Sequence, residues 1–203
     1  MDIVIRPACA ADVGDIAGVL ATAFEDDPYV GWLLPDARSR VVRATRMFTA
    51  LTRHHLLHGH VDVAVDTSGV VRGAALWAPP GQWRHTLRAR AAMLPGLLRA
   101  FGPRIIRLGI GDHQKQRAHP SGLHWYLDVI GTASAVRGLG YGRALVQSRL
   151  AYCDKDGVPV HLQTSKESNL AFYGRFGFDV TDEITLRPGG PQVWSMWRLP
   201  QDG

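Results

Sequence analysis

The sequence predicts an α+β protein built around a mixed β-sheet, which is a sheet with both parallel and antiparallel strand pairs. Two observations carry this prediction. Residues 125–163 read as a strand, a glycine-rich turn, a helix and a second strand, the βαβ unit that joins parallel strands. Residues 179–187 and 192–199 flank a Pro-Gly-Gly turn, which indicates a closing antiparallel hairpin.

The first part of the chain alternates strands and helices. Residues 3–6 predict a short strand, and apolar residues then recur at helical spacing until the Asp-Asp-Pro sequence at 26–28 ends the pattern. A second helix is expected over residues 40–57. Alternating valines at 61–65 and the apolar run at 70–77 predict an antiparallel hairpin, because a Thr-Ser-Gly turn joins them.

The segment that follows this hairpin has a weaker pattern. Residues 83–110 read as mixed helix, rich in arginine and broken by Pro95, Gly102 and Pro103. The pattern alone assigns no role to residues 79–122.

The βαβ unit has the sharpest signals. An apolar run at 125–130 is followed, after the glycine-rich turn, by an amphipathic helix and by a strand at 158–163. A short helix is expected at 170–176, before the closing hairpin. The apolar face of the longer helix carries Ala144, Leu145, Leu150 and Ala151.

Length and composition are those of one compact domain. The chain has 203 residues, 46% of them apolar, and we expect a single domain over residues 1–203. No apolar stretch approaches the roughly 20 residues that span a bilayer, and the first residues lack the layout of a secretory signal. We therefore expect a cytoplasmic protein with no membrane partner. Cys9 and Cys153 fit neither a metal motif nor a disulfide framework.

Charge narrows the classes of ligand. The formal charge of +5 comes largely from dispersed arginines. Nucleic-acid binding is permitted but not required by any basic run, and no helix-turn-helix signature is present. A small polyanion such as a nucleotide phosphate would also use this charge.

The motif Arg-Gly-Leu-Gly-Tyr-Gly at 137–142 lies between a predicted strand and a predicted helix. Unpaired amides and the positive end of the dipole at a helix start favour phosphate. Glycines at 138, 140 and 142 remove side chains that would block close approach of the backbone, and Arg137 can add a charged contact. The alternative is that these glycines only make a tight strand-to-helix turn.

Two other phosphate-binding motifs do not match. The Walker motif needs lysine and then serine or threonine after its last glycine, where this chain has Arg143 and Ala144. The dinucleotide fingerprint needs a glycine where Arg143 stands, and it opens a doubly wound sheet near the start of a domain.

These residues resemble the GNAT superfamily of N-acetyltransferases. Its cofactor motif, Gln/Arg-x-x-Gly-x-Gly/Ala, is matched by Arg137, Gly140 and Gly142, and its helical tyrosine ahead of Gly-Phe is matched by Tyr173 within residues 172–178. Residues 161–173 further resemble the actinobacterial subgroup that includes puromycin N-acetyltransferase.

The chain departs from that subgroup at two places. Ser134 stands where the subgroup usually has proline, and Gln163 stands where it has an acid. Neither change removes a phosphate ligand, but the second removes one possible contact with the substrate, so puromycin is not assumed as the acceptor.

The resemblance implies a GNAT fold and acetyl-CoA as cofactor, with a small-molecule or peptidyl amine as acceptor, attacked directly in a ternary complex. The chain could be a monomer or a homodimer. The implied cofactor-binding residues are Ile130, Gly131, Thr132, Arg137, Gly138, Leu139, Gly140, Tyr141, Gly142, Arg143, Asn169, Phe172 and Tyr173.

The family's chemistry needs three groups. A backbone N–H near residues 130–132 would stabilise the oxyanion, and Tyr173 would protonate the leaving thiolate. Asp128 is the leading candidate for the base, because a carboxylate in a central strand is unusual unless it is paired or functional; by strand alternation it shares a face with Tyr126 and Ile130. Asn169 could contact the cofactor or cap a helix.

Three further groups of residues leave alternatives open. Glu25, Asp26 and Asp27 could contact the substrate, although such a trio is more often solvated. Histidines at 54, 55, 58 and 60 resemble a metal cluster, but we expect no metal because no acid or cysteine accompanies them. The arginine-rich segment 84–107, with Trp77, Trp83 and Trp125, could form an acceptor lid or simply pack.

Two other functions are considered beside the enzyme. A non-catalytic acyl-CoA-binding or sensing module would keep the glycine turn but would need neither acid nor base. DNA binding through the basic surface is weaker, because the arginines lack a reading helix.

Overall fold

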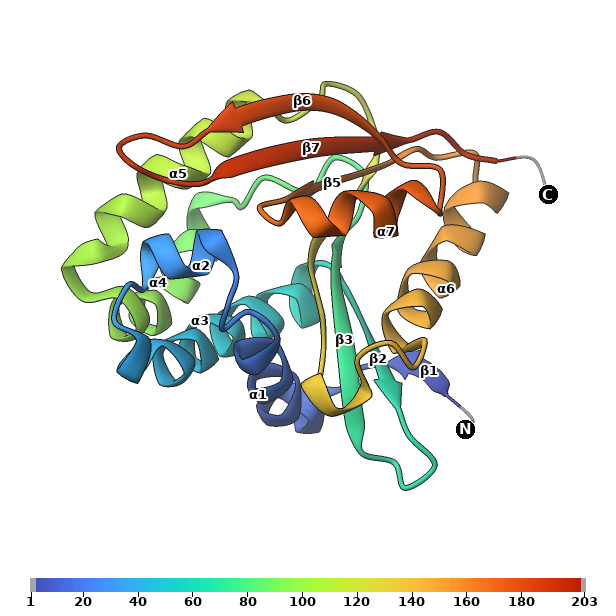
Figure 1. Ribbon diagram of the computed structural model, residues 1–203, viewed down its shortest axis with the longest axis horizontal. Helices are drawn as coiled ribbons and strands as arrows, with labels where there is room; N and C mark the ends of the chain where they lie inside the picture. Colours follow the sequence, from blue (N-terminus) through green and yellow to red (C-terminus); the bar gives the residue numbers. More distant parts are fainter. Residues whose placement is uncertain (1–2, 202–203) are drawn as a thin grey trace.

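In the computed structural model, which describes residues 3–201, the strands form one seven-stranded sheet in the order β1-β2-β3-β4-β5-β7-β6 (Figure 1). Only β4 and β5 pair in parallel; the other neighbours are antiparallel. The strands are β1 Val4–Pro7, β2 His60–Val65, β3 Val71–Ala78, β4 Trp125–Thr132, β5 Val160–Thr164, β6 Asp179–Thr185 and β7 Gln192–Arg198. The predicted mixed sheet is confirmed; the predicted domain limits, 1 and 203, lie outside the described residues.

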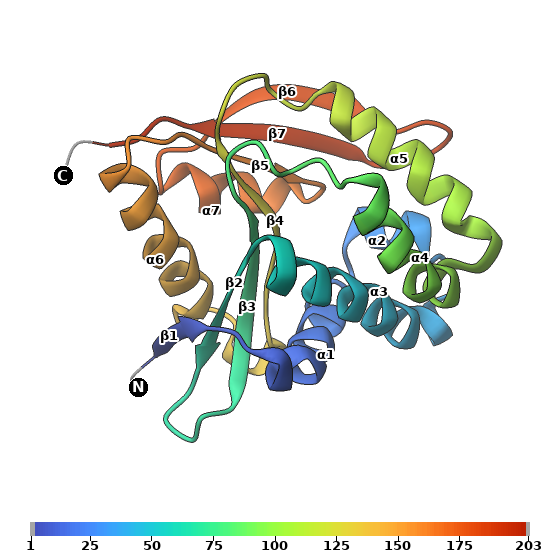
Figure 2. The same ribbon diagram turned by 180° about the vertical axis from the view of Figure 1, so that it is seen from behind.

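Helices cover both faces of the sheet (Figures 1 and 2). They are α1 Val13–Ala23, α2 Pro28–Leu33, α3 Ala37–His58, α4 Leu87–Phe101, α5 Ile105–Arg117, α6 Tyr141–Lys155 and α7 Leu170–Gly174. Helices α1 and α3 pack on one face, and α4 packs on α3. Helix α6 packs on the other face. No helix in residues 3–201 has the length and apolar character needed to cross a membrane.

The core is divided by the sheet into two apolar clusters. Ile16, Leu20 and Phe48 belong to the cluster on the α1 and α3 side. Leu145 and Leu162 belong to the cluster on the α6 side. Burial of these side chains is the main term that holds the helices on the sheet, at roughly 25 cal/mol for each Å² removed from water.

Several element boundaries differ from the prediction. Helix α3 begins at Ala37, earlier than expected, because the Asp36 side chain accepts a hydrogen bond from the backbone N–H of Arg38 at 3.2 Å. Pro95 does not break α4, because it lies on an exposed side where water can reach the carbonyl that loses its partner. The helix ends instead at Gly102, whose φ of 55° leaves the helical region.

Two smaller corrections concern the second half of the chain. Helix α7 ends at Gly174 and not at residue 176, because the next residues form a tight turn through Gly177, which has a φ of 83°. Ala151, expected on the apolar face of α6, is exposed.

Strand β4 contains one extra residue. Leu127 lies opposite Trp77 and Val129 lies opposite Leu76, so Asp128 forms a β-bulge without a partner on β3. Leu127 consequently belongs to the α6-side cluster and Val129 to the α3-side cluster. The prediction that Asp128 shares a face with Ile130 is therefore wrong, because the bulge interrupts the alternation on which it rested.

The parallel pairing of β4 with β5 stops at the bulge. Its register runs from Trp125, opposite Val160, to Leu127, opposite Leu162. Beyond Leu127 the two strands separate, although β4 continues to Thr132. The last residues of β4 therefore present backbone N–H and C=O groups on the β5 side that the sheet does not pair.

A buried ion pair attaches α6 to β2. Arg149 donates to Asp62 Oδ2 at 3.0 Å, and His60 Nε2 lies 2.9 Å from Asp62 Oδ1. The Arg149 guanidinium also lies over the rings of Trp125, at 5.2 Å, and Tyr152, at 5.3 Å. Both members of the ion pair are buried, so each depends on the other for compensation of its charge.

We expect Asp62→Ala to lower the free energy of unfolding by about 3–5 kcal/mol, because it leaves the buried Arg149 charge unpaired. Asp179→Ala, which removes an exposed carboxylate on β6, is the control and should change stability by less than about 0.5 kcal/mol. Urea denaturation at pH 7 measures both. Equal stability of the two variants would show that the ion pair contributes little.

Candidate functional site

A cavity of about 860 Å³ lies beside the glycine-rich turn; we call it the turn cavity. It is bounded by the end of β4, the turn, the start of α6, and α7. Every residue predicted to bind a cofactor lines it, with the exception of Leu139, which is exposed on the outside of the turn.

The turn has the geometry that its glycines predict. Gly138 and Gly140 have φ values of 81° and 91°, which residues with side chains rarely adopt. Gly142, inside α6, has no such constraint: a Cβ there would lie 3.7 Å from Phe172 and 3.8 Å from Thr132, in ordinary contact. The absence of a side chain at Gly142 therefore keeps space open in the turn cavity.

The turn cavity is lined by several positively charged side chains. Arg137, Arg143, Lys166 and Arg175 line it, next to the first turn of α6 with its unpaired N–H groups. This donor set fits a polyphosphate. Sequence reasoning missed Lys166 and Arg175; the signal that could have found them is their position on either side of the helix that carries Tyr173.

A second cavity, of about 570 Å³, lies among α3, α4, α5 and β4; we call it the helix cavity. Much of its wall is apolar, and it also contains the carboxylates of Asp27, Asp112 and Asp128. The apolar side chains include Met47, Phe48, Leu51, Met93, Leu97 and Leu108.

The two cavities share five lining residues, which are Phe24, Asp27, Ile130, Asn169 and Tyr173. Ligands in the two cavities would thus meet next to Tyr173, at the place where β4 and β5 separate. The sequence indicated the residues of the turn cavity and Asp128, but not that they border one continuous site.

Tyr173 is buried on α7, between the rings of Phe172 and Phe178. Burial, together with the nearby charge of Asp27, raises the pKa of its phenol well above the ordinary value. The hydroxyl therefore keeps its proton at neutral pH. The neighbouring Asn169 side chain donates to Thr164 Oγ1 at 3.2 Å and does not cap α7, so the capping alternative is wrong.

The three acidic residues after α1 have different surroundings. Glu25 and Asp26 are exposed, but Asp27 is buried. Asp27 caps α2 by accepting from the backbone N–H of Val30 at 2.9 Å, and it accepts from the Ser165 hydroxyl at 2.8 Å. The expectation of a solvated trio is wrong for Asp27, because its lone pairs are used by these two donors.

Asp128 contacts a buried histidine from α3. His55 Nε2 lies 3.0 Å from Asp128 Oδ2, and His55 Nδ1 lies 3.1 Å from the carbonyl oxygen of Trp77. Burial raises the pKa of Asp128, but the hydrogen bond from His55 and nearby positive charges outweigh burial and hold that pKa well below its usual range.

Asp112 on α5 is a third carboxylate of the helix cavity that sequence reasoning missed. It accepts a hydrogen bond from the Tyr29 hydroxyl at 3.0 Å. Burial raises its pKa above the ordinary value, and the charge of Lys115 only partly offsets this effect. No motif marks Asp112 in the sequence, because its place in the site follows from the packing of α5.

The structure separates the residues that were considered as a possible acceptor lid. The α4 and α5 segment does supply one wall of the helix cavity. The three tryptophans do not line it: Trp77 is fully buried in the core, Trp125 lies under Arg149, and Trp83 stacks on His119. His54, His55 and His58 lie on α3, whereas His60 lies on β2.

Known proteins with similar sequences and structures are acetyltransferases. Residues 105–178 match the acetyltransferase (GNAT) family. An uncharacterized N-acetyltransferase of Schizosaccharomyces pombe is 29% identical over 198 residues, which cover 91% of this chain and 77% of that protein. The crystal structure of a histone acetyltransferase HPA2 and related acetyltransferase from Corynebacterium glutamicum is 28% identical and superposes with a TM-score of 0.76, covering 100% and 99% of the two chains.

Residues 105–178 and the fold of the whole chain are thus similar to the GNAT acetyltransferases, a family that uses acetyl-CoA. Arylalkylamine N-acetyltransferase 2 from Aedes aegypti has the same fold, with a TM-score of 0.65 at 12% identity, covering 99% of this chain and 100% of that one. At that identity the likeness extends to the fold alone.

We expect Gly142→Ala to weaken acetyl-CoA binding while leaving the fold intact. The added methyl group occupies the turn cavity, yet alanine in a helix is more favourable than glycine by roughly 0.5–1 kcal/mol. Calorimetry should show a Kd higher by about tenfold or more, equivalent to about 1.4 kcal/mol.

The matched control is Gly14→Ala on α1, where a Cβ meets nothing within 4 Å. This variant should bind acetyl-CoA like the wild type. An unchanged Kd in Gly142→Ala would show that the turn cavity does not hold the cofactor near this residue.

Proposed function

We propose that this GNAT enzyme transfers an acetyl group to a primary amine that carries an apolar body, with acetyl-CoA in the turn cavity and the amine in the helix cavity. The observation that carries the proposal is the junction of the two cavities at Tyr173. Direct attack in a ternary complex requires the two substrates to meet, and here they would do so beside a buried phenol.

The cofactor would be held by side chains and backbone of the turn cavity. Arg137 and the first turn of α6 face its phosphates, and the unpaired edge of β4 beyond Leu127 offers backbone groups to its extended arm. When bound, acetyl-CoA supplies an activated acetyl group as a thioester. An N–H from residues 130–132 is the proposed donor to the developing oxyanion.

The packing of α1 explains why a glycine occupies position 131 in this edge of β4. A Cβ at Gly131 would lie 2.9 Å from Ala23 Cβ and 3.0 Å from Leu20 Cδ2. Those distances are too short, so glycine allows α1 to pack closely on β4. This contact fixes the edge of β4 relative to α1.

Tyr173 is the proposed general acid. Its raised pKa keeps the hydroxyl protonated at neutral pH, and the proton can pass to a leaving thiolate, which is a stronger base in a site that excludes water. The negative charge of Asp27 contributes to that raised pKa, because it disfavours ionisation of the phenol.

The helix cavity supports an amine as acceptor. Asp27, Asp112 and Asp128 place three carboxylates in a cavity that is lined mainly by apolar side chains and that also contains Arg90 and Lys115. The carboxylates outnumber these two cations, which favours a cationic head on an apolar body. Because the Asp128 pKa is held low, Asp128 stays ionised and suits charge pairing with an ammonium group.

Asp112 is better suited than Asp128 to accept the proton. An alkylamine with a pKa of about 10 is mostly protonated at neutral pH and must lose a proton before it attacks. A base works best when its pKa is near the working pH. The pKa of Asp112 is shifted upward and that of Asp128 downward, so we assign proton acceptance to Asp112 and amine orientation to Asp128.

A non-catalytic acyl-CoA-binding module remains the alternative function. Such a module would need the turn cavity but would have no use for a buried phenol between the cavities. Its mark would be tight cofactor binding without amine-dependent release of thiol. Because the sequence resembles the puromycin N-acetyltransferase subgroup, puromycin is kept as one candidate acceptor to be tested.

We expect Tyr173→Phe to lower kcat by about 100-fold or more, while the Kd for acetyl-CoA stays within about twofold of wild type. The hydroxyl is lost but the buried ring remains. A free-thiol assay with a panel of apolar primary amines, puromycin included, measures kcat. Tyr152→Phe is the control, because that tyrosine is exposed on α6 and should be dispensable. Wild-type turnover in Tyr173→Phe would reject it as the acid.

We expect Asp112→Asn and Asp128→Asn to have different kinetic effects. In the wild type, activity should fall as the pH is lowered through the raised pKa of Asp112, because only its carboxylate accepts a proton. Asp112→Asn should lower kcat by about 100-fold and remove this acidic limb. Asp128→Asn should mainly raise KM for the amine. An unchanged acidic limb in Asp112→Asn would contradict the assignment.

A further inference from the structure

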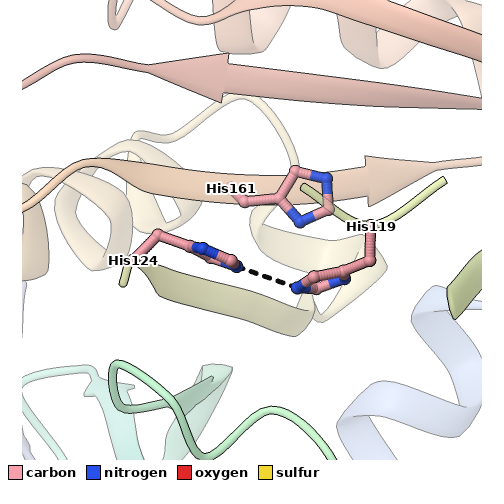
Figure 3. A group of neighbouring side chains, drawn as sticks. All are labelled: His119, His124 and His161. Atoms are coloured by element: carbon pink, nitrogen blue, oxygen red, sulfur yellow. Dashed lines mark hydrogen bonds between the residues drawn. The ribbon is translucent and has the colours of Figure 1, made fainter. Parts of the chain in front are cut away.

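Three histidines from different segments converge at one end of the sheet (Figure 3). His119 follows α5, His124 directly precedes β4, and His161 lies within β5. One ring nitrogen from each lies within 4.8 Å of the others. Figure 3 shows a ring nitrogen of His161 turned toward the nitrogens of His119 and His124.

The hydrogen bonds leave bare nitrogens in this cluster. His124 Nδ1 lies 3.0 Å from the carbonyl oxygen of Gly122, which can only accept, so Nδ1 carries the proton and Nε2 presents a lone pair. That lone pair accepts a hydrogen bond from His119 Nε2 at 2.8 Å. His161 is fully buried, and neither of its ring nitrogens has a hydrogen-bond partner.

A buried imidazole with two unpaired nitrogens is costly unless another group satisfies it. Burial, followed by the neighbouring histidines, lowers the pKa of His119 to about 3 and that of His161 to about 2; burial also lowers that of His124. Neutral imidazole is the form that binds metals.

We propose that His119, His124 and His161 together bind one Zn²⁺ ion. Imidazole suits zinc, whose Zn–N distance is about 2.0–2.1 Å; in a tetrahedral site two such nitrogens lie about 3.3 Å apart. To admit the ion, His119 and His124 would separate by about half an ångström, and the His119 proton that now lies between them would be carried on Nδ1. The Gly122 carbonyl already orients His124 from the second nitrogen, as is usual for zinc ligands.

The surroundings favour a structural role for this ion. None of the three histidines lines the turn cavity or the helix cavity. The ring of Trp83 stacks on His119 at 3.5 Å, and Trp197 packs against His124 at 5.3 Å, so the site has an aromatic shell. Water would take the fourth position.

Zinc at this position would join α5 to the sheet. His119 follows the last residue of α5 by two positions, and α5 carries Asp112 and Lys115 into the helix cavity. The other two ligands belong to the central strands or their immediate start. The ion would therefore hold one wall of the helix cavity against β4 and β5.

The test uses the full chain without an affinity tag, stripped of metal with a chelator and titrated with ZnCl₂ at pH 7.5. We expect one ion per chain with a Kd below about 1 µM, and loss of affinity by about 100-fold or more in His161→Phe. His54→Gln is the matched control, because His54 pairs with His85 at 2.9 Å in a separate histidine group. It should bind zinc like the wild type.

A second variant and two other readouts keep the test decisive. His119→Phe changes a partly exposed residue and should lose zinc binding even if His161→Phe fails to fold. Zinc at 100 times its Kd should raise the Tm of the wild type by about 5–10 °C and slow hydrogen exchange in residues 105–124. Co²⁺ should give the visible spectrum of a tetrahedral site.

No stoichiometric zinc binding by the wild type, or zinc binding with wild-type affinity by both histidine variants, would overturn the proposal. These measurements involve neither acetyl-CoA nor an amine, so their outcome is independent of the proposed acetyl transfer.

Discussion

The extra residue in β4 is the constraint on which the site depends. Without it, Leu127 and Val129 would face the same side of the sheet; with it, they enter opposite cores. The bulge also directs Asp128 toward His55 and coincides with the end of the parallel pairing at Leu127. A bulge bends its strand and increases the local twist, which fits the separation of β4 from β5. Both cavities lie at this separation.

Two buried polar pairs join helices to the sheet. Arg149 meets Asp62 between α6 and β2, and His55 meets Asp128 between α3 and β4. Each pair joins a helix to the sheet, one on each face. Because an unpaired buried charge is far costlier than a paired one, these contacts also specify where each helix lies. His161 differs from these pairs, because neither of its ring nitrogens has a hydrogen-bond partner.

Sequence reasoning predicted the parts with strong local signals. The βαβ unit, the closing hairpin and the glycine turn follow from periodicity and from glycine chemistry, and the turn residues do line one cavity. The bulge at Asp128 could not be predicted, because a single inserted residue leaves no trace in an apolar strand pattern. The helix cavity was missed for a related reason: Asp112 enters it through the packing of α5, which depends on contacts distant in sequence.

The histidines show that closeness in the sequence is also a poor guide to which side chains converge in space. Those at 54, 55, 58 and 60 stand close in sequence yet divide between α3 and β2, while His119, His124 and His161 come from three separate elements and converge. Proximity along the chain was the available signal, and it indicated the first group but not the three histidines that converge in space. Spatial convergence depends on the parallel pairing of β4 with β5, which brings Tyr126 opposite His161.

Asp27 lies where binding of a ligand in one cavity can change the affinity of the other cavity for its own ligand. Its carboxylate borders both cavities and is also held by the start of α2 and by Ser165 after β5. A ligand that shifts this carboxylate from one side alters the surroundings met by a ligand on the other. Thermodynamic linkage makes any such effect reciprocal: if the cofactor strengthens amine binding by some factor, the amine strengthens cofactor binding by the same factor. One capping residue thereby gives the two substrates a route to cooperativity.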